Sequence, residues 1–374
     1  MAVSETSLSE IKNRIPWIDN ARAIGLSLIF LGHLLEIYIT RDNAGAQVRI
    51  TFSLIYSFHV PLFFFLSGIV FRERTKVLYK DVFIAFISLY IPFIFFELVS
   101  FFYNFVVLFW QIRNIDVVFE YFRQLMPDFR IFLEGYQVFS ATSWFFSCLL
   151  AVQVIYLVAA RFIRSSGALF ASAIMFSIVG YFAARAKSGN FGEYVLGDVQ
   201  GFFYIQSALV ALCFFQIGIL MRDFIRKMSI PTSYIIFAAV PLWLGLSWLN
   251  LKNLPMLHDK VQASLLNGLA LGDYFLYFPA AFLGIASVII ISKAIPGNRV
   301  MGYVGRNSLY FVGLNGLVFA MQDYLYFPGL SGSRMFLPFA VLLVTVNMIL
   351  FAPLVSALAF LWSRGRSCML GIVS

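Results

Sequence analysis

Two ionisable residues, Arg22 and His33, lie within the first long apolar stretch of this 374-residue chain. Each would cost roughly 2.5 kcal/mol or more at the centre of a bilayer unless it faced protein or water. Eleven residues of α-helix turn about 1100° and rise about 16 Å, so the two side chains share one face at different depths. This spacing predicts a site reached from both sides of a membrane. Alternatively, Arg22 extends to the interface and His33 bonds a neighbouring helix.

Two carboxylates lie near these residues on the same predicted helix. Asp19 precedes Arg22 by three residues and Glu36 follows His33 by three, a spacing at which side chains are neighbours on a helix surface. A carboxylate bonded to an imidazole fixes its tautomer and increases its basicity. The pattern predicts catalysis by His33 as general base, oriented by Glu36, with Arg22 acting at the other end of the same face.

The second apolar stretch, residues 50–71, contains His59 followed by Pro61. A proline inside a spanning helix interrupts the backbone hydrogen bonds, and such breaks are tolerated where they line a cavity. We therefore expect a break near His59. The histidine itself either binds substrate or bonds the broken backbone.

Four cations follow this stretch within nine residues: Arg72, Arg74, Lys76 and Lys80. One interpretation is an anchor beside anionic lipid. The other is a site for a phosphorylated ligand, because planar guanidinium groups fit phosphates.

Further candidate substrate-binding residues lie in later apolar stretches. Trp144 opens the fourth stretch, where a residue of an interfacial belt is also expected. Asn307 and Ser308 open the ninth, where either could cap a helix, and Asn315 lies further along it. His258 lies in an outer loop and is expected to be solvated. The three His and three Cys have no metal-ligand spacing, so no metal is predicted.

The elements that must position these residues are membrane-spanning helices. The chain is 61% hydrophobic and 12% charged, whereas soluble domains carry about 25% charged residues. Apolar runs of about 20 residues are typical of transmembrane helices. The prediction is an all-α, polytopic bundle of about ten helices forming one domain over residues 1–374. The predicted spans are roughly 18–39, 50–71, 82–110, 143–162, 167–185, 201–221, 231–250, 272–292, 305–326 and 336–361.

The distribution of Lys and Arg predicts the orientation of the bundle, because these residues favour the cytoplasmic side. With ten spans, sixteen of the 27 fall on the side of the N-terminus, ten fall on the other side, and Arg22 lies within a span. Both termini are therefore predicted to be cytoplasmic. The first 16 residues lack the order of a cleaved signal, so the first span is expected to be retained. The net charge of +9 reflects this topology and predicts no nucleic-acid partner.

Together these segments resemble the bacterial membrane acyltransferase family 3, which includes many polysaccharide O-acetyltransferases. The resemblance covers about 300 residues and rests on Asp19, Arg22, Gly32-His33, residues 58–68 (FHVPLFFFLSG), Trp144-Phe145 and residues 305–310 (GRNSLY).

The resemblance implies transfer of an acyl group, usually acetyl from cytosolic acetyl-CoA, to a sugar hydroxyl on the far side of the bacterial inner membrane. The implied acceptor is an exopolysaccharide, a lipopolysaccharide or a lipid-linked glycan. Arg22 and His33 match the essential pair of the family. Arg72 and Arg74 fall near its donor-linked Arg-x-x-Arg motif but are spaced Arg-x-Arg, and Asn315 stands where many members have His. The residues expected to hold the phosphates of CoA are Arg22, Arg72, Arg74 and Lys76.

Two other classes of function fit the residues alone. A transporter or flippase of lipid-linked sugars would also need charges in the membrane and broken helices, although the two halves of the chain show no clear repeat. A non-catalytic membrane partner in glycan assembly is the third hypothesis. Release of thiol from acetyl-CoA would distinguish an enzyme from both. The sequence indicates no partner for Glu97, an acid within the third predicted span.

Overall fold

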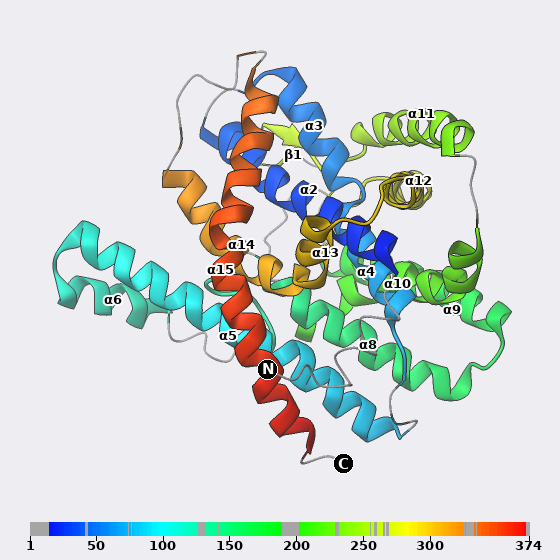
Figure 1. The fold of residues 1–374 in the computed structure, drawn as a ribbon, viewed down its shortest axis with the longest axis horizontal. Helices are drawn as coiled ribbons and strands as arrows, with labels where there is room; N and C mark the ends of the chain where they lie inside the picture. The colour runs from blue at the N-terminus through cyan, green and yellow to red at the C-terminus, as the bar shows by residue number, and fades with distance from the viewer. Residues whose placement is uncertain are drawn as a thin grey trace.

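The computed structural model describes residues 15–41, 44–73, 75, 77–125, 132–140, 142–188, 202–228, 232–254, 256–257, 260–264, 266, 269–324, 326, 333 and 335–371. Most of these residues lie in α-helices (Figure 1). The helices are α2 (Pro16–Arg41), α3 (Ala46–Tyr56), α4 (His59–Val70), α5 (Leu78–Ile112), α6 (Ile115–Leu125), α8 (Trp144–Phe162), α9 (Ser166–Ser188), α10 (Ile205–Lys227), α11 (Thr232–Leu251), α12 (Tyr274–Ala294), α13 (Arg299–Arg306), α14 (Ser308–Tyr324) and α15 (Phe336–Gly371). A 3-10 turn, η2 (Phe202–Tyr204), and a short antiparallel pair, β1 (Met256–Leu257) and β2 (Val261–Gln262), complete the described elements.

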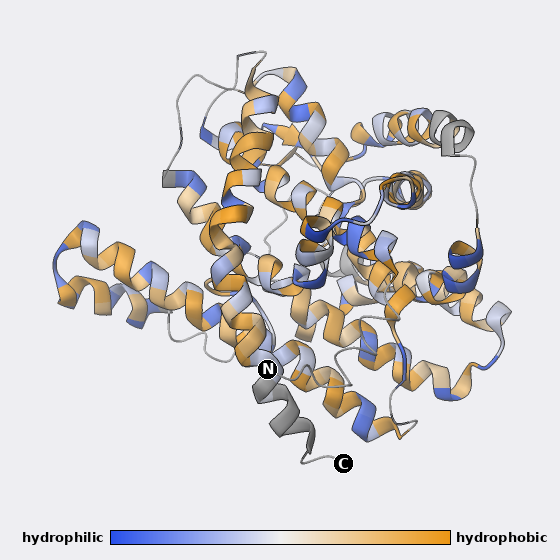
Figure 2. Cartoon of the chain, in the orientation of Figure 1, coloured by the Kyte–Doolittle hydropathy of each residue, from blue (hydrophilic) through white to orange (hydrophobic). Residues whose placement is uncertain are grey.

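Eight helical segments of the described chain are long and apolar enough to cross a membrane. They are α2, α3 with α4, α5, α8, the first part of α9, η2 with α10, α12 and most of α15. The seventh and ninth predicted spans fall on α11, where Ala238–Leu251 is a shorter apolar stretch, and on the 17-residue α14. Apolar residues dominate the helices throughout (Figure 2). The predicted all-α polytopic bundle is confirmed, since every predicted span coincides with a helix or with consecutive helices.

The second span is broken between α3 and α4. Ser57 and Phe58 form a turn that separates the two helices, and the Ser57 hydroxyl accepts a hydrogen bond from the Trp243 indole at 3.1 Å. Pro61 is the third residue of α4, in the first helical turn, where the N–H it lacks has no partner within the helix. The break expected near His59 is confirmed, and His59 is the first residue after it.

Helix α2 lies in the middle of the bundle and runs parallel to α14. At the start of α2, Gly305 packs so closely on the backbone of Asp19 that a Cβ at Gly305 would lie 2.2 Å from the Asp19 carbonyl oxygen. At the other end of the two helices, Arg41 forms an ion pair with Asp323. We call the side of the bundle where α2 begins the inner side and the side where α2 ends the outer side.

Helix α4 runs antiparallel to α2. The first half of α2 meets the middle of α4 at Gly25, where a Cβ would lie 2.9 Å from both Leu62 and Phe63. Near the outer end of α2, Gly32 faces Tyr56 of α3 in the same way, at 3.0 Å. Small residues on α2 therefore allow the broken helix to approach the face that carries Arg22 and His33.

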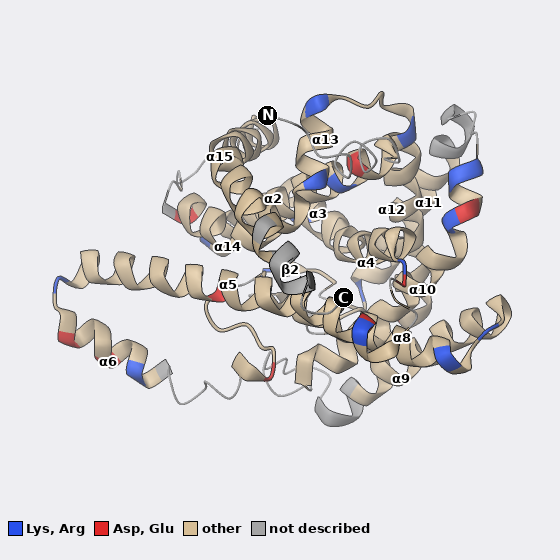
Figure 3. Ribbon diagram, turned by 60° about the horizontal axis from the view of Figure 1, so that its bottom comes forward, with Lys and Arg blue, Asp and Glu red and all other residues tan. Residues whose placement is uncertain are grey.

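Cations hold the inner ends of several helices. Arg222 of α10 donates hydrogen bonds to the carbonyls of Gly68 and Phe71 at the end of α4. Lys293 of α12 donates to two carbonyls at the end of α10, including that of Met228 at 2.8 Å. The last carbonyls of a helix have no partner within it, so these cations satisfy both the orphan acceptors and the helix dipole. Charged residues are sparse along the helices and gather toward their ends (Figure 3).

Helices α5 and α6 form a hairpin that projects from the body of the bundle (Figures 1 and 3). The turn passes through Arg113, which has a left-handed backbone with φ of 55°. Phe122 of α6 folds back on Phe101 and Phe105 of α5, with ring centroids 4.9 and 5.6 Å apart. Aromatic contacts therefore fix α6 along the outer half of α5.

Candidate active site

A cavity of about 260 Å³ lies in the outer half of the bundle, beside the break between α3 and α4. Its walls come from α2, the end of α3, α4, α14, the first residues of α8, β1 and the loops that precede α8 and α12. The polar lining residues include His33, Glu36, Tyr56, His59, Gln137 and Trp144. An apolar cavity with a few convergent polar groups is the usual form of a ligand site.

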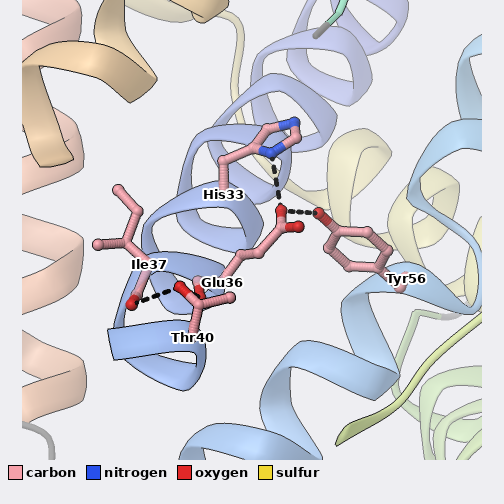
Figure 4. A network of polar contacts seen from close by, with 5 residues as sticks. All are labelled: His33, Glu36, Ile37, Thr40 and Tyr56. Atoms are coloured by element: carbon pink, nitrogen blue, oxygen red, sulfur yellow. Dashed lines mark hydrogen bonds and ion pairs between the residues drawn. The ribbon is translucent and has the colours of Figure 1, made fainter. Parts of the chain in front are cut away.

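His33 and Glu36 form the centre of a polar network on the cavity wall (Figure 4). The His33 Nδ1 lies 3.2 Å from Glu36 Oε2, and the Tyr56 hydroxyl donates to the same oxygen at 3.1 Å. An ionised carboxylate only accepts hydrogen bonds, so Nδ1 carries the proton and Nε2 is left as an acceptor, turned away from Glu36 (Figure 4). The two side chains are 19% and 21% exposed, which leaves them open to the cavity. The predicted contact between His33 and Glu36 is confirmed.

Tyr56 is a member of this network that sequence reasoning missed. It lies 20 residues from Glu36, at the end of α3, so only tertiary packing joins the two. Its ring also packs on those of His59 and Phe52, at centroid distances of 4.7 and 4.0 Å. Its position directly before the helix break was the available signal, because residues at such a break face the cavity.

His59 lines the same cavity and also bonds the broken backbone. Its Nδ1 lies 2.8 Å from the carbonyl oxygen of Ile55 in α3, and its side chain is buried. A carbonyl only accepts, so Nδ1 donates and the second ring nitrogen is an acceptor. His59 thus bonds the interrupted backbone, as one interpretation predicted, and it also contributes to the cavity wall.

Trp144 lies at the start of α8 and lines the cavity, with 8% of its surface exposed. Its ring centroid lies 5.9 Å from that of Tyr204. The neighbouring Thr142 donates a hydrogen bond to the carbonyl of Val312 in α14 at 2.9 Å. Trp144 is therefore buried at the cavity wall rather than exposed in an interfacial belt.

Glu97 of α5 holds the loop that leads into α8. Its Oε2 accepts hydrogen bonds from the backbone N–H groups of Val138 and Phe139 at 3.0 and 2.7 Å. Its Oε1 accepts from the N–H of Ser140 at 3.3 Å and from the Ser143 hydroxyl. The carboxylate is 1% exposed, and hydrogen bonds to a charged acceptor are among the stronger ones. The sequence indicated no partner for Glu97 because these donors belong to a loop more than 40 residues away.

Arg22 does not line the cavity, although it lies on the same strip of α2 as His33. The innermost lining residues of α2, α4 and α14 are Ile29, Phe63 and Val312, which are all apolar. Arg22 precedes Ile29 by seven residues, which is about two turns and about 10 Å of rise. Apolar packing therefore separates Arg22 from the cavity in this structure.

The three candidate residues of α13 and α14 also lie outside the cavity lining. The Asn307 side chain donates to the carbonyl of Tyr303 at 2.9 Å and caps α13, while Ser308 is the first residue of α14. Asn315 is 0% exposed, and both of its amide atoms lack a hydrogen-bond partner within the described structure. It lies on α14 between Val312 and Phe319, which both line the cavity.

The predicted donor-binding cations lie on the inner side. Arg72 is exposed and lies two residues beyond the inner end of α4, which rises about 16 Å from His59 to Val70. It lies close enough to Arg222 for the two charges to repel each other. Arg74, Lys76 and His258 lie outside the described residues.

The fold and the cavity define an integral membrane protein that encloses a histidine–carboxylate pair. Among the residues the structure describes, no group of three or more His, Cys, Asp or Glu could hold a metal ion. The chain matches the family model described as an acyltransferase domain, acyltransferase family 3, over residues 15–363, and it belongs to this family. No curated protein and no solved structure matches the chain. The protein is therefore a membrane acyltransferase.

Proposed function

We propose that this acyltransferase moves an acetyl or similar acyl group from cytosolic acyl-CoA to a hydroxyl of a sugar on the outer side of the bacterial inner membrane. The acceptor is an exopolysaccharide, a lipopolysaccharide or a lipid-linked glycan. The observation that carries the proposal is the hydrogen bond from His33 to Glu36 on the wall of a cavity in the outer half of the bundle. A base placed there can reach a hydroxyl group that enters from the outer side.

In the direct route, His33 Nε2 takes the proton of the sugar hydroxyl as its oxygen attacks the thioester carbonyl carbon. The new C–O bond forms, the C–S bond breaks, and the imidazolium returns the proton to the CoA thiolate. Glu36 stabilises the imidazolium and keeps its ring in place, and Tyr56 holds Glu36. General-base catalysis of this kind contributes typically 10²–10⁴-fold.

A two-step route uses the same atoms. His33 Nε2 attacks the thioester carbonyl carbon, the C–S bond breaks, and an acyl-imidazolium that keeps its Nδ1 proton forms as CoA leaves as the thiolate. The sugar oxygen then attacks the acyl carbon, the N–C bond breaks to restore neutral His33, and the hydroxyl proton passes to solvent, from which the thiolate takes up a proton. An acylated protein that accumulates without acceptor would indicate this route.

The donor enters from the inner side in this proposal. Arg22 and Arg72, together with Arg74 and Lys76, hold the phosphates of CoA at the inner mouth. The pantetheine arm then runs along the strip of α2 from Arg22 to His33, a rise of about 16 Å. Because Ile29 and its apolar neighbours close the inner end of the cavity, this path requires them to move when the donor binds.

The remaining candidates divide between the two substrates. Asn307 and Ser308 lie at the inner end of α14, level with the start of α2, so we assign them to the donor. His59 and Trp144 line the cavity, so we assign them to the acceptor. Asn315 has a buried amide with unused hydrogen-bonding capacity and serves the acceptor from α14.

The test uses the purified protein in lipid nanodiscs with labelled acetyl-CoA and a panel of methyl glycosides as acceptors, measuring free thiol and transferred label. Wild-type protein should release thiol and Glu36→Gln should lose most of this activity. Glu120→Gln is the matched control, because Glu120 also bonds a residue three positions away, Arg123, on the exposed α6. Absence of thiol release by the wild-type protein, or equal loss in the two variants, would contradict the proposal.

A further inference from the structure

The loop that precedes α8 forms one wall of the cavity and is fixed at successive backbone groups. The N–H groups of Val138, Phe139 and Ser140 all donate to Glu97. Gln137 directly precedes these three residues. Because the backbone is held at three consecutive residues, the point from which the Gln137 side chain projects is fixed.

The amide oxygen of Gln137 has no hydrogen-bond partner among the residues described. Gln137 lines the cavity, and its Oε1 is buried. Buried acceptors are nearly always bonded, and an exception requires an explanation. Gln137 itself lines the cavity, so rotation about its side-chain torsions would bring the unbonded oxygen to a molecule bound there, which could supply the missing donor.

We infer that Gln137 binds the acceptor substrate by accepting a hydrogen bond from one of its hydroxyl groups. The inference rests on the proposed function and names a residue that fixes acceptor orientation. The loop follows the outer end of α5 and α6, so it lies on the side from which the acceptor enters. A sugar carries several hydroxyl groups. If Gln137 binds one of them, the orientation of the sugar is fixed, and with it the hydroxyl group that faces His33.

Glu97 is the positioning residue of this arrangement. It contacts the loop backbone but does not line the cavity. It therefore acts on the acceptor through Gln137 and the residues that follow it. Because the buried Glu97 carboxylate holds the loop backbone, a small shift of the loop cannot bring a hydrogen-bond donor to the Gln137 oxygen.

The test measures acetyl transfer to methyl glucoside, methyl galactoside, methyl mannoside and methyl rhamnoside, and to the monodeoxy derivatives of whichever is acetylated. Gln137→Leu should raise the apparent KM for the glycoside about tenfold, the size expected for one hydrogen bond. It should leave the KM for acetyl-CoA within about twofold. Gln137→Glu, which keeps an accepting oxygen, should recover much of the loss. Gln124→Leu is the matched control, because Gln124 lies exposed on α6.

The deoxy derivatives separate binding from a general effect on folding. With the wild-type protein, one deoxy derivative should be a weaker acceptor than its parent glycoside. With Gln137→Leu, the same derivative and its parent should be equal acceptors, because this variant lacks the oxygen to which the hydroxyl would donate. Equal penalties in both proteins, or a raised KM for acetyl-CoA alone, would overturn the inference and leave the proposed function intact. Thiol release without transfer to any glycoside would overturn both this inference and the sugar acceptor of the proposed function.

Discussion

The outer and inner halves of the bundle use their polar side chains for different purposes. In the outer half, His33 and Gln137 each keep one unused acceptor atom at the cavity wall. In the inner half, Arg222 and Lys293 donate hydrogen bonds to backbone carbonyls at the ends of neighbouring helices. Asn20 does the same, donating to two carbonyls at the end of α12. Arg222 Nε and Arg226 Nε also lack a partner among the described residues, but neither residue lines this cavity. Unused acceptor atoms at the cavity wall, rather than charge, therefore distinguish the outer half.

The comparison limits what a count of Lys and Arg can show. The excess of cations on the inner side predicts orientation, and it also suggests abundant sites for phosphate. Two of these cations are bound to backbone carbonyls and cannot serve both purposes without leaving the helix ends exposed. The phosphates of the proposed donor would thus have fewer partners than composition alone suggests.

The strongest test of the outer half is His33→Gln. Glutamine keeps a polar side chain of similar size but cannot take up a proton near neutral pH. We expect acetyl transfer to fall by roughly 10²–10⁴-fold with an unchanged KM for acetyl-CoA, as measured by label transfer over a range of acetyl-CoA concentrations. An activity within threefold of wild type, at equal protein content, would show that His33 in the outer half is not the reacting base.

Glu97→Gln should have the next largest effect. The amide keeps one accepting oxygen and replaces the other by a donor that faces backbone N–H groups. Losing hydrogen bonds to a charged group should lower stability by about 2 kcal/mol and raise the KM for the acceptor.

Asp81→Asn is the inner-half counterpart of this change. Asp81 is also buried and accepts a hydrogen bond from the backbone N–H of Thr75 at 2.9 Å. It should lower the thermal stability of the protein without changing the KM for the acceptor. If the two variants change acceptor KM equally, the loop that carries Gln137 has no special role.

Arg222→Met tests the structural use of inner cations. The substitution removes two hydrogen bonds to the end of α4 while keeping an unbranched side chain. We expect a loss of about 1–3 kcal/mol in the free energy of unfolding, measured by thermal or denaturant unfolding in detergent. Activity per folded molecule should be retained. A raised KM for acetyl-CoA without loss of stability would instead assign Arg222 to the donor.

Arg41→Ala should have the smallest effect. The ion pair with Asp323 joins the outer ends of α2 and α14, and its side chains are 47% and 36% exposed. Exposed pairs contribute about 0–1 kcal/mol and weaken further in salt. The free energy of unfolding should therefore change by less than about 1 kcal/mol. The salt dependence of transfer activity should be the same in Arg41→Ala and in the wild-type protein. A larger loss of activity would show that the outer ends of these helices control the cavity.

The sequence could predict features that depend on neighbours along one helix. Span positions follow from apolar length, the contact of His33 with Glu36 follows from helical spacing, and the break before His59 follows from Pro61. Contacts between distant segments were not predictable in this way. Tyr56 reaches Glu36, and Glu97 reaches the loop before α8, only because separate helices pack together.

The separation of Arg22 from the cavity is a further limit of the sequence. Helical spacing correctly places Arg22 and His33 on one strip of α2. It gives no information about Phe63 and Val312, which come from other helices and fill the space next to Ile29. Whether a shared face becomes an open channel depends on the side chains opposite it.

Helix α5 has a consequence for the surrounding lipid. Its 35 residues extend about 52 Å, whereas the hydrocarbon core of a bilayer is about 30 Å thick. A helix longer than the hydrocarbon core tilts, kinks or thickens the bilayer around it, and α5 also contains Pro92. Glu97 of this helix binds the loop that forms part of the cavity wall. A change in bilayer thickness that altered the tilt of α5 would therefore act on this wall of the cavity.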